Sequence, residues 1–185
     1  PGMYIGSTST LGLHHLVWEI VDNAVDEANE GYGKNIFITI HTDGSLEVED
    51  QGRGVPCDYN EKEKMNGFQI VYQTLHGGGK FDESNYKSAG GLHGVGASVT
   101  NALSKWMEVH SYRDGIDHFA RFEKGGSTFS GIKELGKTTK RGTDVRFFPD
   151  DEIFEDITFN FDRIASHLDD QACLTKGVTF HLFDE

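Results

Sequence analysis

Cysteine and long apolar runs are both scarce in this sequence. Cys57 and Cys173 are the only cysteines in 185 residues, and their wide separation fits neither a disulfide framework nor a zinc site. No segment approaches the roughly 18 apolar residues of a membrane span, and the start lacks the positive and then apolar pattern of a signal peptide. These absences exclude a disulfide-rich secreted domain and a membrane protein. They predict a reduced, cytoplasmic setting without a membrane partner.

Positive charge is scarce as well, whereas glycine is abundant. The chain has 17 Lys and Arg against 30 Asp and Glu, a net charge of −13. Because binding to a nucleic-acid backbone needs clustered Lys and Arg, the chain is not expected to hold DNA by itself. Seven of the 23 glycines fall between Gly77 and Gly96. Such a local cluster indicates that the backbone approaches a ligand closely or moves.

The spacing of apolar residues predicts one α+β domain spanning residues 1–185. Residues 12–30 carry apolar side chains at the i, i+3, i+4, i+7 spacing of an amphipathic helix. Helices and mostly antiparallel strands occur in separate runs, which is typical of a layered sandwich. Further helices are expected near 68–75, 95–104 and 160–172, and strands near 36–40, 46–48, 106–113, 116–123, 128–135, 143–148 and 178–183. Because the chain opens at Pro1 and closes directly after a strand-like run, we expect an excised domain.

The predicted first helix carries a carboxylate and an amide four residues apart, Glu19 and Asn23. Residues at this spacing project from one face of a helix. A carboxylate there can orient an attacking water, and an amide oxygen can serve Mg²⁺, which prefers oxygen ligands and retains several waters. Taken alone, the same pattern also fits a solvated acidic face.

A second candidate site follows the predicted strand that ends before Asp50. Gly52 and Gly54 allow the backbone to approach a flat ligand, and the Asp50 carboxylate can accept a hydrogen bond from an exocyclic amine. An ordinary strand-ending turn remains the alternative. Thr143 begins another predicted strand, and its hydroxyl could share a hydrogen bond with Asp50, although a strand-edge threonine is common.

The glycine-rich stretch leads into a predicted helix and suits an anion. Freed backbone N–H groups and the positive end of the helix dipole together favour phosphate binding, to which Lys80 adds a charge. However, Lys80 is followed by Phe81, which excludes a P-loop, and Gly94-Val95-Gly96 lacks the third glycine and preceding strand of a dinucleotide-binding fold. No zinc-type histidine cluster, serine elbow or cysteine nucleophile motif is present either.

Taken together and in this order, the motifs resemble the ATP-binding domain shared by gyrase, heat-shock protein 90, histidine kinases and mismatch-repair MutL, the GHKL fold. The match is closest to the B subunits of bacterial type IIA topoisomerases, gyrase or topoisomerase IV, and covers essentially the whole chain. It is carried by Pro1–Gly6, Gly12–Ala24, His76–Phe81 and Gly90–Ser104. The resemblance implies a two-layer sandwich whose mixed, mostly antiparallel sheet is covered by helices on one face.

The resemblance also implies that the domain binds and hydrolyses ATP with Mg²⁺. Glu19 would be the general base that activates water, Asn23 would hold Mg²⁺, and His15 would support Glu19. Asp50 would accept the adenine amino hydrogen bond, with Thr143 sharing a bridging water. Arg53 would pack against adenine and pair with Glu27, and the pocket would be lined by Gly54, Val55 and Pro56. The phosphates would be held by Lys80 and by the amides of Leu92, His93, Gly94, Val95 and Gly96. Tyr86 would touch the nucleotide from a lid over 77–96.

Arg113 would lie at the mouth of this site, where aminocoumarin-type inhibitors of the family bind. The implied partners are the topoisomerase A subunit, a second B subunit and, through other domains, DNA at the bacterial nucleoid. An N-terminal arm before Pro1 and a downstream transducer domain would be missing, so the isolated chain should hydrolyse ATP weakly. The segments Trp106–Val109 and Phe122–Gly126 are more similar to topoisomerase IV than to gyrase.

Three other functions compete with this one. A histidine-kinase catalytic domain needs no water-activating glutamate four residues before the asparagine, so Glu19 favours hydrolysis. A chaperone or mismatch-repair ATPase is disfavoured by Gly90–Ala97 and Pro1–Gly6. A non-catalytic nucleotide-sensing module remains possible on sequence grounds.

Overall fold

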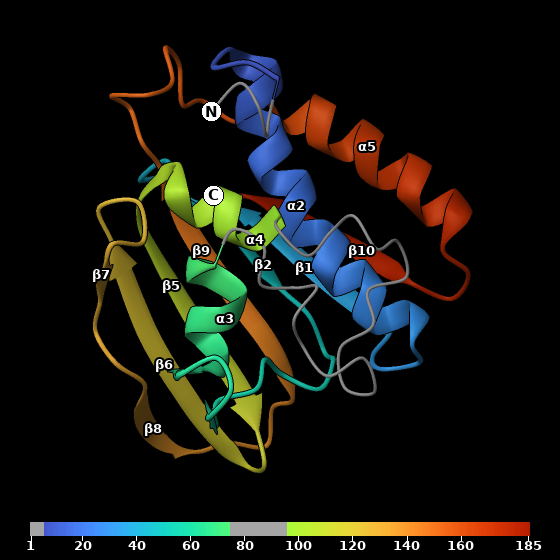
Figure 1. Cartoon of the computed structure of the whole chain (residues 1–185). Helices are drawn as coiled ribbons and strands as arrows, with labels where there is room; N and C mark the ends of the chain where they lie inside the picture. The colour runs from blue at the N-terminus through green and yellow to red at the C-terminus, as the bar shows by residue number, and fades with distance from the viewer. Residues whose placement is uncertain (1–5, 75–95) are drawn as a thin grey trace.

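Helices pack against one face of an eight-stranded sheet (Figure 1). The computed structural model describes residues 6–74 and 96–185. The helices are α2 (Thr10–Asn29), α3 (Gly67–Gln73), α4 (Gly96–Ala102) and α5 (Phe161–Leu174). The strands are β1 (Asn35–Ile40), β2 (Leu46–Glu49), β3 (Tyr59–Asn60), β4 (Met65–Asn66), β5 (Ser104–Arg113), β6 (Ile116–Glu123), β7 (Thr128–Phe129), β8 (Lys133–Lys137), β9 (Gly142–Pro149) and β10 (Thr179–Asp184).

The main sheet is mixed but almost entirely antiparallel. Its order is β10-β1-β2-β9-β5-β6-β7, with β8 pairing with β6. Only the pairing of β1 with β10 is parallel among the strand pairs of the described ranges. The predicted α+β sandwich with a mixed, mostly antiparallel sheet and helices on one face is therefore confirmed.

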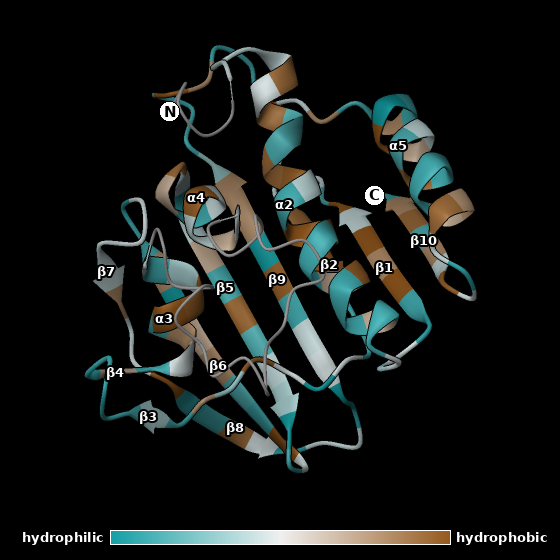
Figure 2. Cartoon of the chain, turned by 45° about the vertical axis from the view of Figure 1, so that its right-hand side comes forward, coloured by the Kyte–Doolittle hydropathy of each residue, from teal (hydrophilic) through white to brown (hydrophobic). Residues whose placement is uncertain are grey.

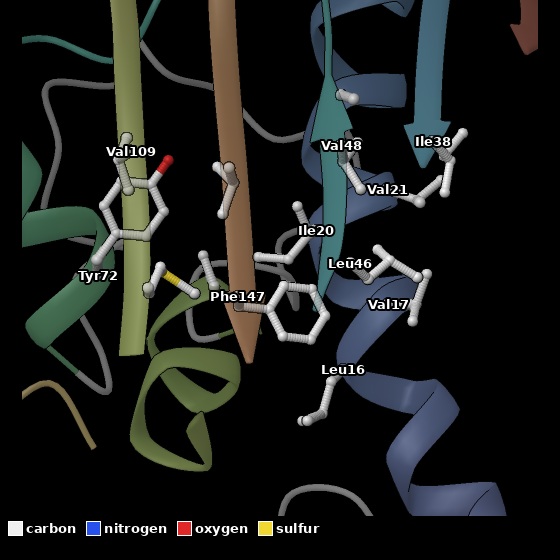
Figure 3. Packing of buried hydrophobic residues seen from close by; sticks show 14 of the residues in the cluster. Leu16, Val17, Ile20, Val21, Ile38, Leu46, Val48, Tyr72, Val109 and Phe147 are labelled. Atoms are coloured by element: carbon white, nitrogen blue, oxygen red, sulfur yellow. The ribbon is translucent and has the colours of Figure 1, made fainter. Parts of the chain in front are cut away.

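The core lies between helix α2 and the centre of the sheet. Leu16, Val17 and Ile20 of α2 are at most 3% exposed, and Figure 3 shows them facing buried side chains of the central strands. Along the strands, hydrophobic and hydrophilic residues alternate, as the colours of β5 and β9 show in Figure 2. One sheet face thus joins the core while the other carries charged and aromatic side chains. Burial of each large apolar side chain contributes about 1.5–3 kcal/mol.

Two details differ from the sequence prediction. The predicted strand over 128–135 is divided into β7 and β8, because the chain turns at Gly131, whose φ is +81°. The short hairpin of β3 and β4 was not predicted, since two-residue strands show no alternation that a pattern could reveal. Among the helices of residues 6–74 and 96–185, none combines the length and hydropathy that a membrane-spanning segment requires.

Candidate functional site

A cavity lies between α2, α3 and the adjoining ends of β2 and β9. Its walls are mostly apolar, and its floor carries a carboxylate, Asp50. The sheet brings this carboxylate beside two polar residues of helix α2, Asn23 and Glu27. The complete lining consists of Ile20, Asn23, Glu27, Val48, Asp50, Val55, Val71, Tyr72, Thr143 and Val145. An apolar pocket with a few convergent polar groups is the usual form of a small-molecule site.

Asp50 is held rigidly and is almost completely buried. It directly follows β2 and is 9% exposed. Its Oδ1 accepts backbone N–H bonds from Gly52 at 2.8 Å and from Thr143 at 3.1 Å. Within the described ranges Oδ2 accepts no hydrogen bond, so it can accept one from a ligand. Burial, helped by the charges of Glu27 and Glu49, raises the pKa of Asp50 to about 7 against the opposing effect of the two N–H bonds.

Thr143 reaches Asp50 differently from the sequence prediction. The Asp50 N–H donates to the Thr143 carbonyl at 2.9 Å, which continues the pairing of β2 with β9 by one residue. As a result the Thr143 backbone N–H, and not its hydroxyl, bonds to the Asp50 carboxylate. The hydroxyl instead accepts the N–H of Val55 at 3.1 Å. Its own hydrogen remains available to a ligand or water in the cavity.

Glu27 and Arg53 form an ion pair beside Asp50. The guanidinium Nη2 donates to Glu27 Oε1 at 2.8 Å, and Nε donates to Oε2 at 3.2 Å. The Arg53 backbone N–H also donates to Oε2, at 2.9 Å. The guanidinium lies 4.5 Å above the ring centre of Tyr32, a cation–π contact on its outer side. The pairing that the resemblance implied is therefore present, and it joins the loop after β2 to helix α2.

The loop from Gly54 to Pro56 is fixed from the sheet side by β5. Ser111 donates from its hydroxyl to the Val55 carbonyl at 2.7 Å, and Arg113 donates to the Gly54 carbonyl at 2.9 Å. Gly54 has a φ of +82° and lies so close to Ser111 that a Cβ would meet its Oγ. Arg113 also lines an open hollow beside the cavity, together with Arg53 and Lys140. Arg113 thus contacts the loop that borders the cavity but is not among the residues that line the cavity, and its predicted place at the mouth of the site stays a prediction.

Helix α2 presents Glu19, Asn23 and Glu27 at four-residue intervals. Asn23 and Glu27 reach the cavity of Asp50. Glu19 lies toward the start of α4, where its Oε2 occupies the space that a side chain on Gly96 would fill. The helix therefore carries a carboxylate against the point where the glycine-rich stretch ends.

The two adjacent histidines of α2 have different surroundings. His14 is fully buried; its Nδ1 donates to the Thr10 carbonyl at 2.7 Å, and its Nε2 accepts the N–H of Asn160 at 2.9 Å. Burial lowers its pKa. His15 is partly exposed and lies one turn before Glu19. Its role in supporting Glu19 stays a prediction.

Several predicted site residues lie outside the described residues. They are Lys80, Tyr86, Leu92, His93, Gly94 and Val95. Conversely, sequence reasoning missed part of the pocket wall. Val71 and Tyr72 of α3 line the cavity, but their apolar helical spacing is the same as that of core residues. Arg141 directly precedes Gly142-Thr143, but no role was predicted for it; its Nε donates to the Gly52 carbonyl at 3.1 Å and so contacts the loop after β2.

Comparison with known proteins gives one family and a set of close relatives. The model of the family described as "Histidine kinase-, DNA gyrase B-, and HSP90-like ATPase" matches residues 8–153. The chain is 53% identical over 186 aligned positions to the B subunit of DNA topoisomerase 4 from Enterococcus faecalis, covering 100% of this chain and 27% of the relative. It is 52% identical over 185 positions to the protein of the same name from Staphylococcus aureus, covering 100% and 28%. The chain thus spans just over a quarter of the length of these relatives.

Proposed function

The chain belongs to the family of histidine kinase-, DNA gyrase B- and HSP90-like ATPases, and we propose that it is the ATP-binding and ATP-hydrolysing domain of a type II DNA topoisomerase. Topoisomerase IV is preferred over gyrase, because the relatives at 52–53% identity over the whole chain carry that name. Residues 1–185 form one domain in this proposal. The pairing of β10 with β1, which joins the last strand to the first, supports it.

The observation that carries the proposal is the buried carboxylate of Asp50, which would recognise adenine. An adenine amino group is a donor, and Asp50 Oδ2 is a buried acceptor at the floor of an apolar cavity. The Thr143 hydroxyl would hold a water that bridges Asp50 and the base. Arg53 would pack against adenine while Glu27 holds its guanidinium, and Gly54, Val55 and Pro56 would line the edge of the base.

Hydrolysis would proceed mainly by positioning and charge neutralisation, as in phosphoryl transfer generally. Glu19 would accept a proton from the attacking water, and His15 would orient Glu19. Asn23 fits a magnesium ligand, because its amide can offer an oxygen at the edge of the cavity that contains Asp50. Magnesium, when bound, neutralises phosphate oxygens. Asn23 would hold the ion, and Glu19 would hold the water against the γ-phosphate.

The phosphate contacts are proposed from the sequence. Lys80, Tyr86 and the amides of the segment 92–96 would surround the phosphates, with 77–96 as a lid over the nucleotide. The position of Gly96 against Glu19 supports this arrangement, since it places the start of α4 beside the proposed base.

In the complete protein the domain would drive ATP-dependent DNA strand passage in the bacterial cytoplasm, at the nucleoid. Its partners would be the topoisomerase A subunit and a second B subunit. DNA would be held by other domains, as the net charge of −13 suggests. Aminocoumarin-type inhibitors would bind at the rim formed by Arg113 and compete with ATP.

Titration calorimetry with a non-hydrolysable ATP analogue and Mg²⁺ tests the proposal. Wild type should bind saturably, and Asp50→Asn should not, because its amide can present a donor to the adenine donor. Asp169→Asn is the matched control, since Asp169 is exposed on α5 and its replacement should leave binding unchanged. Folded wild type that binds no analogue, or Asp50→Asn that binds as wild type does, would refute the adenine site.

A further inference from the structure

Three carboxylates converge on the sheet face opposite the cavity. Glu47 and Glu49 lie on β2, and Asp144 lies on β9 directly opposite Glu49 in the strand register. Their neighbours Val48 and Val145 line the cavity, so alternation along the strands directs the three acids to the other face. One oxygen from each carboxylate lies within 4.8 Å of the others.

Asp144 has the strongest requirement for a ligand among the three. It is 7% exposed, and its Oδ1 is buried without a hydrogen-bond partner in the described part of the chain. Buried polar atoms in native proteins are nearly always paired, because leaving a carboxylate oxygen unpaired costs free energy. The Asp144 carboxyl group belongs to the acidic cluster, so a cation held by the three carboxylates would give this group a partner.

The neighbouring basic side chains pair with the other two acids and not with Asp144. Lys140 lies 3.1 Å from Glu49 Oε1, and His41 lies 2.7 Å from Glu47 Oε1. Among the described residues no basic side chain forms an ion pair with Asp144, so a cation bound within the cluster would balance its carboxylate.

We propose that Glu47, Glu49 and Asp144 form a binding site for a divalent cation of the size of Ca²⁺. Hard cations take oxygen ligands, and Ca²⁺–oxygen distances of about 2.3–2.6 Å allow ligand oxygens to lie up to about 5 Å apart. Mg²⁺, at about 2.0–2.1 Å, would require separations of no more than about 4.2 Å. The observed limit of 4.8 Å therefore suits Ca²⁺ without movement of the strands. Glu47 and Glu49 are 23% and 26% exposed, which leaves room for water as the remaining ligands.

The ion would connect β2 and β9 directly behind the cavity. Asp50 and Thr143 meet at the cavity floor. In the sequence Glu49 directly precedes Asp50, and Asp144 directly follows Thr143. A cation shared by Glu49 and Asp144 would hold these strand ends together. The site is separate from the magnesium position proposed at Asn23, because the sheet lies between them, and it does not depend on the ATPase proposal.

Calcium chloride titrated into the nucleotide-free chain tests the site by calorimetry, with terbium luminescence as a second readout. Tb³⁺ replaces Ca²⁺, and Tyr112 is placed to sensitise it, because the Lys140 Nζ that lies 3.1 Å from Glu49 Oε1 is also 5.2 Å from the centre of the Tyr112 ring. Wild type should bind with a dissociation constant of about 0.1–1 mM, as weak calcium sites do, and its melting temperature should rise with Ca²⁺. Asp144→Asn and Glu49→Gln should each weaken binding at least tenfold.

Two control variants separate this site from its surroundings and from the nucleotide site. Glu108→Gln removes an acid from the same sheet face that pairs with Arg121, and it should bind Ca²⁺ as wild type does. Asn23→Ala should also retain Ca²⁺ binding. Folded wild type without saturable binding, or equal binding by wild type and Glu49→Gln, would overturn the proposal. Because Glu49 is partly exposed, its variant provides this test even if Asp144→Asn fails to fold.

Discussion

Glu27 accepts three hydrogen bonds from a single residue, Arg53, which lies 26 positions further along the chain. Two come from the guanidinium and one from the backbone N–H, so both the side chain and the loop itself are fixed. Glu27 is only 8% exposed. The pair therefore holds the loop after β2, with Asp50 at its start, against the helix that carries Glu19 and Asn23.

Arg53→Ala should destabilise the protein strongly. The substitution leaves the buried Glu27 carboxylate without its cation, and breaking such a pair costs about 3 kcal/mol. Lys105→Ala is the control, because its pair with Asp151 is 44% and 50% exposed and should contribute nothing measurable. Urea unfolding of both variants measures the difference. Equal unfolding midpoints for the two would show that the Glu27 pair is not a structural link.

The affinity for an ATP analogue should fall as the pH drops below 7. Asp50 has a raised pKa of about 7, and only its ionised form offers an acceptor without a competing O–H donor. Affinity should approach a tenfold loss for each pH unit below 7. Calorimetry at pH 6, 7 and 8 measures this. Glu49→Gln removes a charge that raises the Asp50 pKa, so it should move the transition to lower pH; an unmoved midpoint would assign the titration to another group.

Asp50→Asn should make the folded chain more stable at pH 8 while abolishing nucleotide binding. The Asp50 pKa is about 7 when folded and 3.8 as the reference value, so the folded state binds more protons between these values. The stabilising contribution of protonated Asp50 is fully present below about pH 4 and is lost as the pH rises through 7. The variant should gain at most about 4 kcal/mol at pH 8. Urea unfolding should show a much smaller gain at pH 5; a gain independent of pH would contradict the raised pKa.

Glu19→Gln should bind ATP normally yet hydrolyse it about 10²–10⁴ times more slowly, the usual effect of losing a positioned base. Glutamine preserves the shape that packs against Gly96, so the loss would report chemistry and not packing. The measurement is steady-state ATP hydrolysis by the full-length protein, with analogue affinity measured alongside. Near-normal turnover would remove Glu19 from the role of base, whereas lost affinity would indicate a binding residue.

Much of the fold could be predicted because the apolar residues of the long helices and strands recur at a regular spacing. The helix expected over 12–30 is α2, Thr10–Asn29, and the predicted strand over 116–123 is β6. Where an element is only two residues long, as in β3 and β4, there is too little alternation to detect. Burial patterns of such short pieces are decided by the elements around them, which the local sequence does not contain.

The site was less accessible from sequence because its residues meet through the sheet register. Asp50 and Thr143 are 93 positions apart, and only the pairing of β2 with β9 brings them together. The residues alone did not indicate that the Thr143 backbone, rather than its hydroxyl, bonds to Asp50. Tyr72 has the helical spacing of a core residue, and whether such a side chain faces core or cavity depends on neighbouring elements.

Gly142→Ala should disrupt both the fold and the site, because Gly142 lies against the backbone of Asp50. Its φ is +127°, and an added Cβ would overlap the Asp50 carbonyl oxygen, which cannot move without breaking the pairing of β2 with β9. Gly131→Ala is the matched control: Gly131 also has a positive φ, +81°, but nothing lies within 4 Å of its Cβ position. The free energy of unfolding of the control should fall only by the cost of the left-handed backbone conformation, about 1–2 kcal/mol. That of Gly142→Ala should fall by roughly 3 kcal/mol or more. The folded fraction of Gly142→Ala should also bind the ATP analogue weakly. Similar losses in unfolding free energy for the two variants would mean that the contact with Asp50 does not constrain this strand.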